Sequence, residues 1–396
     1  MEENPLLTLP RPVIEAFFRC AEEEAVRARE RIEGLEQRLE WLKGRLSFVE
    51  IEGSRYGRTV AVDGSMSGTA SKRLGSEFGI YTAGYMVFDG VELVDEKYAA
   101  GSLSWTEGMR SFRTLLRLLM AYAERRLALE AYWKYQPDYI LLDGPFFYFR
   151  GYCRYIRDVE IGVDDIETGL DLIHRVRDMT LSLMRMGRAV CVIKRSRIRA
   201  IDGWLLFHRG EEACVGTKDK HILAMLMPAG SIWSYRSLLD DDPLVYASLY
   251  RFYRRWRQVG KSAEELRGKM GELVEQVRKD WARKFEVDLD MDINEAPETE
   301  RYYIRYSPTA PPFEIEVLKG TDVEEFARYF MELHNPASGL PLPLDLVDGA
   351  VLLPRGSTTA FTREVEARLI ADRGIPDKQA ISDYFTYLNP QKEEYV

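Results

Sequence analysis

Two aspartates in this sequence each end a short hydrophobic run and each precede a glycine. Asp63 follows Thr59–Val62, and Asp143 follows Tyr139–Leu142. Runs of apolar and β-branched residues are typical of buried strands, and the glycine that follows predicts where each strand stops. Two strand ends side by side would present carboxylate oxygens rigidly, as a hard divalent cation requires. The pattern therefore predicts a metal-dependent phosphodiesterase site.

The alternative interpretation of each Asp-Gly pair is a tight turn. Glycine tolerates positive φ, and aspartate hydrogen-bonds its own backbone, so turns are the commoner use of this dipeptide. Two copies, each after a hydrophobic strand and with a long helical stretch between them, favour a site. The spacing alone does not decide between the two interpretations.

The composition sets limits on the class of protein. At 396 residues, 46% hydrophobic and 30% charged, the chain has the make-up of an ordinary globular protein. No apolar run reaches the roughly 18 residues needed to cross a bilayer. The N-terminus lacks the basic start and apolar core of a signal peptide. We therefore expect a cytoplasmic protein.

Cysteine and histidine usage argues against a zinc enzyme. The four cysteines show no paired spacing, and none of the four histidines falls in an HExxH-type pair. The formal net charge of −9 argues against a general polyanion-binding surface. Any contact with nucleic acid would therefore depend on local basic patches, or on a partner that delivers the substrate.

A long amphipathic helix is predicted over about Arg11–Glu50, with two prolines at its start and Gly53 past its end. Its apolar residues between Ile32 and Leu46 step by three and four, as in a coiled-coil seam. A helix this long rarely buries its whole apolar stripe on one small domain. We expect either a dimer or partner contact, or packing on its own domain.

The elements after this helix follow one another in an informative order. Three strands are predicted, then a helix, a strand, a helix and a strand, at about 59–65, 78–88, 91–98, 106–134, 139–143, 164–186 and 189–194. This is the order of the ribonuclease-H-like fold, whose mixed sheet carries acidic residues at the ends of its first and fourth strands. Asp63 and Asp143 occupy those positions. We predict this α/β fold, with helical insertions and the long N-terminal helix.

The rest of the chain is predicted to elaborate a single domain. We expect a short helix at 219–226, a hairpin at 301–306 and 313–318, and helices at 323–333, 345–353 and 362–372. A charged helical stretch at 244–285, broken near Gly260, interleaves arginines with aromatic residues; it predicts either a surface for single strands or an amphipathic helix. The predicted division is 1–55 for the N-terminal helix and 56–396 for the catalytic domain, with an insertion at about 243–290.

A third carboxylate is expected on the helix between the third and fourth strands. Two-metal phosphodiester cleavage needs three or four converging carboxylates, and the candidates are Glu107, Glu124 and Glu130. The helix dipole already explains an acidic residue such as Glu107 at the helix start. Glu124 and Glu130 are six positions apart, so they point about 120° away from each other. Glu130 is expected nearer the apolar stripe of this helix, and Glu124 borders that stripe. Helix geometry alone does not decide which of the two faces the site.

Several short motifs occur in an order that resembles the NurA nuclease family. They are Ala61–Ser65, Glu124 ahead of Leu141–Gly144, Val192–Arg197, Gly216–Lys220 and Leu340–Leu344. The resemblance covers roughly Thr59–Leu353. It implies a manganese-dependent DNA nuclease, with Mg²⁺ as the alternative ion, acting as a single-strand endonuclease and a 5′–3′ exonuclease. It also implies a homodimer that works with the hexameric ATPase HerA in DNA end resection and double-strand break repair.

The resemblance also assigns site residues. The family's metal-binding and catalytic carboxylates match Asp63, Glu124 and Asp143. Where the family usually has a histidine after the Pro-x-Pro-Leu stretch, this sequence has Asp348. An aspartate can also bind a hard cation, so Asp348 is the expected fourth metal ligand. His334, nearby in sequence, is the alternative.

A basic run follows the fifth strand. Lys194 ends that strand and Arg195, Arg197 and Arg199 come after it. Phosphate positioning is expected here, with Lys194 in a catalytic role, because backbone charge must be neutralised at a strand end that faces the cleft. The alternative is a solvated charge cluster. Two other functions stay open: a non-catalytic adaptor of a ring ATPase, and a ribonuclease-H-like nuclease with another nucleic-acid substrate.

Overall fold

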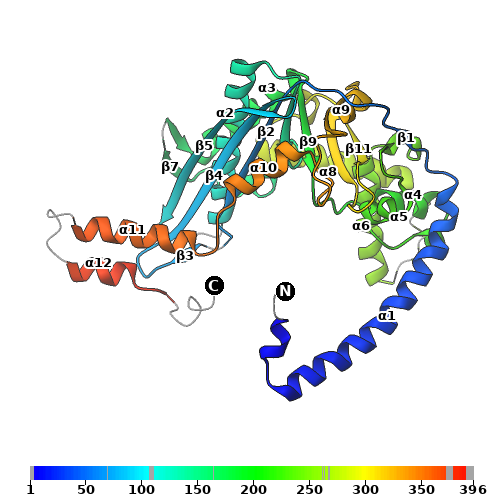
Figure 1. Cartoon of the computed structure of the whole chain (residues 1–396), viewed down its shortest axis with the longest axis horizontal. Coiled ribbons are helices and arrows are strands. Elements are labelled where there is room, and N and C mark those ends of the chain that lie inside the picture. Colours follow the sequence, from blue (N-terminus) through cyan, green and yellow to red (C-terminus); the bar gives the residue numbers. More distant parts are fainter. Residues whose placement is uncertain are drawn as a thin grey trace. The chain divides into compact units, whose positions relative to one another are not determined.

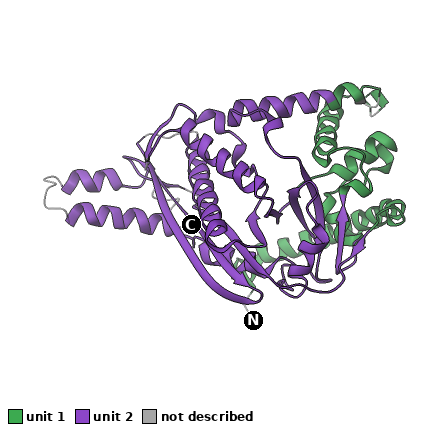
Figure 2. Cartoon of the chain, turned by 90° about the horizontal axis from the view of Figure 1, so that it is seen from above, with its two compact units in different colours: residues 1–47, 197–226, 235–274 green, residues 48–196, 227–234, 275–396 purple. Residues whose placement is uncertain are grey.

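The computed structural model describes residues 4–68, 70–106, 111–163, 165–260, 262, 264–265, 268–371 and 378–388 (Figure 1). Its chain divides into two compact units, coloured separately in Figure 2. Unit 1 contains Met1–Ser47, Arg197–Leu226 and Tyr235–Val274, and unit 2 contains Phe48–Ser196, Met227–Ser234 and Glu275–Val396. The N-terminal helix thus groups with two later segments. The division at residues 55 and 56 stays a prediction.

Unit 2 is built on one mixed sheet. Its strands are β1 (Val49–Glu50), β2 (Arg58–Met66), β3 (Ser71–Lys72), β4 (Glu77–Asp89), β5 (Glu92–Trp105), β6 (Tyr139–Asp143), β9 (Ala189–Ile193), β10 (Ser231–Ser234), β11 (Thr299–Arg305) and β12 (Phe313–Leu318). A small separate hairpin pairs β7 (Glu160–Val163) with β8 (Ile166–Thr168).

The centre of the sheet has the predicted strand order. β5, β4, β2, β6 and β9 lie side by side; β2 pairs with β6 and β6 with β9 in parallel, and the other pairs are antiparallel. This arrangement confirms the ribonuclease-H-like fold. Gly90, with a φ of +60°, lies in the turn that joins β4 to β5.

The sheet continues beyond the predicted core. β12 pairs antiparallel with β9, and β11, β10 and β1 follow in that order. The sequence predicted the β11–β12 hairpin but not its place beside β9. β9 is therefore an interior strand.

Helices cover both faces of this sheet. The helices of unit 2 are α2 (Phe112–Tyr135), α3 (Gly169–Arg185), α9 (Val323–Phe330), α10 (Leu342–Val351), α11 (Ser357–Ala371) and α12 (Lys378–Phe385). One core joins α2 and α3 to Val60, Val62, Ile140 and Leu142. The other joins α9 and α10 to the alternate residues Ala61, Leu141, Val190 and Val192. Strand alternation therefore decides which face each site residue can reach.

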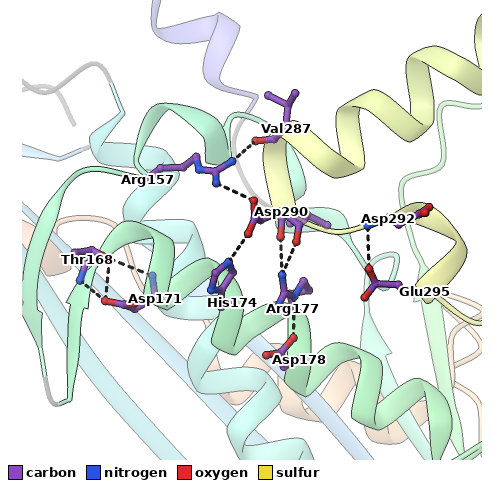
Figure 3. A network of polar contacts seen from close by, with 11 residues as sticks. Arg157, Thr168, Asp171, His174, Arg177, Asp178, Val287, Asp290, Asp292 and Glu295 are labelled. Atoms are coloured by element: carbon purple, nitrogen blue, oxygen red, sulfur yellow. Dashed lines mark hydrogen bonds and ion pairs between the residues drawn. The ribbon is translucent and has the colours of Figure 1, made fainter.

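The end of α8 (Met270–Leu289) is clamped within unit 2 (Figure 3). Asp290, in a left-handed conformation with φ of +54°, accepts hydrogen bonds from Arg157 and contacts His174. Arg177 donates to the carbonyls of Leu289 and Asp290. Arg177 thus satisfies carbonyl groups that a helix C-terminus leaves without partners.

Unit 1 is helical over its described residues. It contains α1 (Arg11–Lys43), α4 (Ala200–His208), α5 (Asp219–Leu226), α6 (Pro243–Gln258) and the first residues of α8. Of the α1 side chains only Leu39 and Leu42 are buried, and the large apolar residues Val13, Phe17, Phe18, Val26 and Ile32 are exposed. Within the described ranges, no helix combines the length and the apolar character needed to cross a bilayer.

Candidate metal centre

Three aspartates far apart in the sequence meet where the parallel pairing of β2 with β6 ends. Asp63, Asp143 and Asp348 each bring one carboxylate oxygen within 4.8 Å of the others. Asp63 is buried, with 2% of its surface exposed, Asp143 is half-buried and Asp348 is exposed. The burial therefore increases from the α10 helix towards the sheet.

The sheet register explains why the first two meet. Val62 of β2 is paired with Leu142 of β6, and the strands are parallel, so the next residues, Asp63 and Asp143, share one level. Both lie two residues after a residue of the α9–α10 core, Ala61 or Leu141, so they face the same side of the sheet.

Asp348 reaches this level because α10 packs against β2, β4 and β6. The C-terminal end of α10 is also tied to the neighbouring strands. The Thr82 hydroxyl donates to the Val351 carbonyl at 2.6 Å, and the Leu353 amide donates to Ser65 Oγ at 3.3 Å. The third carboxylate is thus held by a helix that is fixed to the strands carrying the site.

Glu124 approaches from the opposite face. It lies on α2, 4% exposed, and its Oε1 is so close to Gly64 that a Cβ there would be 2.5 Å away. Glu130 has 41% of its side chain exposed and pairs with Lys97. The expectation that Glu130 is nearer the apolar stripe was therefore wrong, because β5 supplies it with a partner at the surface. Glu107 lies outside the described residues.

The Lys194 ammonium contacts all three aspartates. Lys194 follows β9, and its Nζ lies 3.2 Å from Asp63, 3.6 Å from Asp143 and 3.4 Å from Asp348. Only 16% of its side chain is exposed. A positive charge thus lies at the point where the three carboxylates converge.

The charges of this cluster shift one another's pKa values. Burial raises the pKa of Asp63 well above its usual range; the charge of Asp143 adds to this effect and Lys194 opposes it. Burial also raises the pKa of Asp143, opposed by Lys194 and reinforced by Asp348. Burial by itself lowers the pKa of Lys194, but the aspartates outweigh it and the pKa rises. The cluster is an environment that favours additional positive charge.

Burial raises the pKa of Glu124 to about 7, while Arg125 and the Tyr148 hydroxyl oppose the rise. Tyr148 donates a hydrogen bond of 2.7 Å to Glu124 Oε2, and Arg125 Nη1 lies 3.7 Å from the same oxygen. Sequence reasoning missed both residues. The available signal was Arg125 itself, a charged residue adjoining Glu124 inside an apolar stretch of helix.

The basic run is divided between the two units. Arg195 is exposed, and its charge lowers the pKa of Asp143. Arg197 and Arg199 belong to unit 1. There Arg199 donates to the Gly216 carbonyl at 3.2 Å and lies over the Tyr250 ring. Of the four predicted DNA-binding residues, Lys194 and Arg195 therefore belong to the metal centre in unit 2.

His334 lies apart from the cluster. Its ring stacks on Tyr306 with centroids 5.2 Å apart, and its Nδ1 is 2.8 Å from the Met331 carbonyl. The group of potential metal ligands found among the described residues contains Asp348 and not His334.

The donor set consists of carboxylate oxygens. Such ligands suit hard cations such as Mg²⁺ and Mn²⁺ and disfavour soft ones. Asp143 is the last residue of β6, as predicted, but the prediction that Gly64 ends the first strand was wrong, because β2 stays paired with β4 as far as Met66. A mixed sheet of ribonuclease-H-like order, with Asp63 and Asp143 on neighbouring parallel strands, defines a ribonuclease-H-like protein with a candidate divalent-metal centre.

Comparisons with known proteins agree with this class. A family model described as the NurA domain matches residues 57–351. The crystal structure of the NurA nuclease from Sulfolobus solfataricus is similar with a TM-score of 0.59 at 15% identity, covering 93% of this chain and 100% of that chain. A crystal structure of NurA bound to dAMP and manganese gives a TM-score of 0.47 at 12% identity, covering 94% and 99%. No curated protein sequence matches the chain.

The chain belongs to the NurA family, because the family model covers most of its length. The match ends at residue 351, the last residue of α10, and so includes Asp63, Glu124, Asp143, Lys194 and Asp348.

Proposed function

We propose that this protein is a metal-dependent DNA nuclease that acts on single strands and DNA ends, as an endonuclease and a 5′–3′ exonuclease. The observation that carries the proposal is the convergence of Asp63, Asp143 and Asp348 within 4.8 Å, with Glu124 beside them. Phosphodiester hydrolysis at paired metal ions requires such a group of carboxylates on rigid elements. Membership of the NurA family supports the same activity.

Asp63, Glu124, Asp143 and Asp348 would hold the cation, which we propose is Mn²⁺, with Mg²⁺ as the alternative. The bound ion would supply a water nucleophile at neutral pH and stabilise the leaving oxygen. The residues fit this group because all four donors are carboxylates and three of them already converge. Asp63 and Asp143, on the neighbouring parallel strands β2 and β6, would set the position of the cation, and Asp348 would add an exposed ligand.

Lys194 has a role in phosphate binding in this proposal. Its ammonium lies among the aspartates, next to the place where a scissile phosphate must come. Lys194 and Arg195 would neutralise and orient the DNA backbone there. Arg199 also contacts Gly216 and Tyr250, and its contact with DNA, like that of Arg197, stays a prediction.

We further propose that the protein forms a homodimer and works with a HerA-type hexameric ATPase in DNA end resection and double-strand break repair in the cytoplasm. The exposed apolar side chains of α1 support a protein contact, since single-domain packing leaves them in water. Replacing Phe17 and Phe18 together with aspartate should weaken that contact. Light scattering and co-purification with the ATPase would measure it.

The direct test is cleavage of single-stranded DNA by the purified protein with Mn²⁺, compared with EDTA. The cleavage rate of Asp143→Ala should be more than about 100-fold below that of the wild type. Such a loss exceeds the one expected when a residue that only supports a metal ligand is replaced. Glu130→Ala is the matched control on α2, because its partner is Lys97. Cleavage that survives in EDTA, or full activity of Asp143→Ala, would reject the proposal.

A further inference from the structure

The two oxygens of Glu124 have different surroundings. Oε2 accepts a hydrogen bond of 2.7 Å from the Tyr148 hydroxyl, and the buried Arg125 lies 3.7 Å from it. Oε2 therefore already has two polar partners within the protein, Tyr148 and Arg125. Oε1 lies on the other side, against the backbone of β2.

Gly64 makes room for Oε1. A Cβ at residue 64 would lie 2.5 Å from Oε1 and 3.0 Å from Met120 Cγ, so a larger residue would push the carboxylate away. Gly64 directly follows Asp63, and its amide donates to Asp63 Oδ1 at 2.7 Å. Glycine thus allows a side chain on the α2 face to reach the level of the aspartates on the opposite face.

Tyr148 reaches Glu124 because the chain turns back directly after Asp143. Gly144 has a φ of +77°, and the Tyr148 amide donates to the Pro145 carbonyl at 3.1 Å. The same turn is tied to its neighbours at Phe146. Arg125 Nη2 donates to the Phe146 carbonyl at 3.3 Å, and the Phe146 amide donates to a carboxylate oxygen of Glu316 on β12 at 3.1 Å. The turn that carries Tyr148 is therefore held at Phe146 by side chains of α2 and β12.

We propose that Tyr148 is a positioning residue, whose hydroxyl holds Glu124 so that Oε1 is the oxygen presented to the cation at Asp63 and Asp143. The inference rests on the proposed metal-dependent function. A glutamate side chain loses rotamer freedom when it becomes a ligand, and a hydrogen bond that already fixes it lowers that loss on binding. Tyr148 touches the ligand and not the reacting atoms, so its effect passes through Glu124.

The test is Tyr148→Phe, which removes the hydroxyl and keeps the ring. Mn²⁺ binding is measured without DNA from the electron paramagnetic resonance signal of free Mn²⁺, and cleavage is measured in parallel. We expect the Kd for Mn²⁺ to rise about 10- to 100-fold, and kcat to fall while KM for DNA is unchanged. Tyr152→Phe is the matched control, because Tyr152 lies four residues further on, is exposed and stacks on Tyr155.

A double-mutant cycle separates positioning from a general structural role. In a Glu124→Gln background, Tyr148→Phe should weaken Mn²⁺ binding no further. Wild-type Mn²⁺ affinity in Tyr148→Phe, or an equal loss in both backgrounds, would overturn the proposal. Gly64→Ala gives an independent test of the same geometry and should weaken binding too. A wild-type protein that binds Mn²⁺ but cleaves no DNA would contradict the proposed function, and the binding measurements would still decide the role of Tyr148.

Discussion

Asp63 and Asp143 occupy the same level of two neighbouring parallel strands, because Val62 and Leu142 are paired immediately before them. Their carboxylates are held by the hydrogen-bonded sheet and not by loops. Parallel strands thus bring like charges together in a buried place, where their repulsion opposes folding.

Replacing Asp63 by asparagine should abolish cleavage and yet stabilise the metal-free protein. The raised pKa of Asp63 shows that its surroundings disfavour the charged form, since burial and Asp143 outweigh Lys194. A neutral isostere removes that penalty, so we expect the melting temperature in EDTA to rise by a few degrees. Differential scanning calorimetry would measure it. A lower melting temperature than wild type would show that the Lys194 contact dominates.

The stability of the metal-free protein should depend on pH through Glu124. Burial raises its pKa from 4.5 to about 7, so between these values the native state holds a proton that the unfolded chain releases. Stability must then fall as the pH rises through this window. The loss is about 3 kcal/mol, taking 1.36 kcal/mol for each pKa unit. Urea unfolding in EDTA at pH 5 and pH 7.5 would measure it. Glu124→Gln cannot ionise and should lack this part of the slope; identical slopes in both proteins would refute the assignment.

Removal of the Lys194 charge should separate metal binding from cleavage. The ammonium contacts the three carboxylates, so an added cation competes with it. We expect Lys194→Met to bind Mn²⁺ on the order of tenfold more tightly, equivalent to about 1.4 kcal/mol, and to cleave DNA more slowly. Isothermal titration calorimetry would measure the Mn²⁺ affinity, and a cleavage assay would measure the rate. Lys97→Met, at the Glu130 ion pair, is the control. Unchanged affinity and unchanged cleavage would exclude both roles of Lys194.

Asp348 and His334 can be distinguished by paired substitutions. Asp348→Asn should weaken Mn²⁺ binding by about tenfold, less than loss of Asp63, because 54% of the Asp348 side chain is exposed and water can replace it. His334→Ala should leave Mn²⁺ affinity unchanged, since that ring packs on Tyr306. Titration of both variants with Mn²⁺ checks this. The reverse pattern would return the fourth ligand to His334.

The sequence carried the central part of the fold because its signals are local. The hydrophobic runs before Asp63 and Asp143 marked β2 and β6, although β2 continues past Gly64 to Met66. The short strand β10 gave no such signal: four residues, Ser231–Ser234, are too few for a period to show, and only pairing with β11 makes them a strand.

Side-chain partners made across the fold could not be predicted. Helical spacing alone did not decide whether Glu124 or Glu130 faces the sheet. The difference comes from their partners, because Glu130 pairs with Lys97 and Glu124 lies against Gly64. Arg199 was grouped with Lys194 by proximity in sequence, but its contacts are Gly216 and Tyr250. Tyr148 was missed because nothing local links a tyrosine in a turn to a glutamate 24 residues earlier.

The strands that carry the aspartates and lead to the lysine have hydrogen-bonded neighbours along both sides. β2 lies between β4 and β6, β6 between β2 and β9, and β9 between β6 and β12. Among the described strands, β1 lies at one margin, and β5 and the short β3, both paired with β4, lie at the other. Unpaired margins are where foreign chains add to a sheet. Strand exchange or fibril-like association of this protein would therefore begin at a margin and leave the acidic cluster intact.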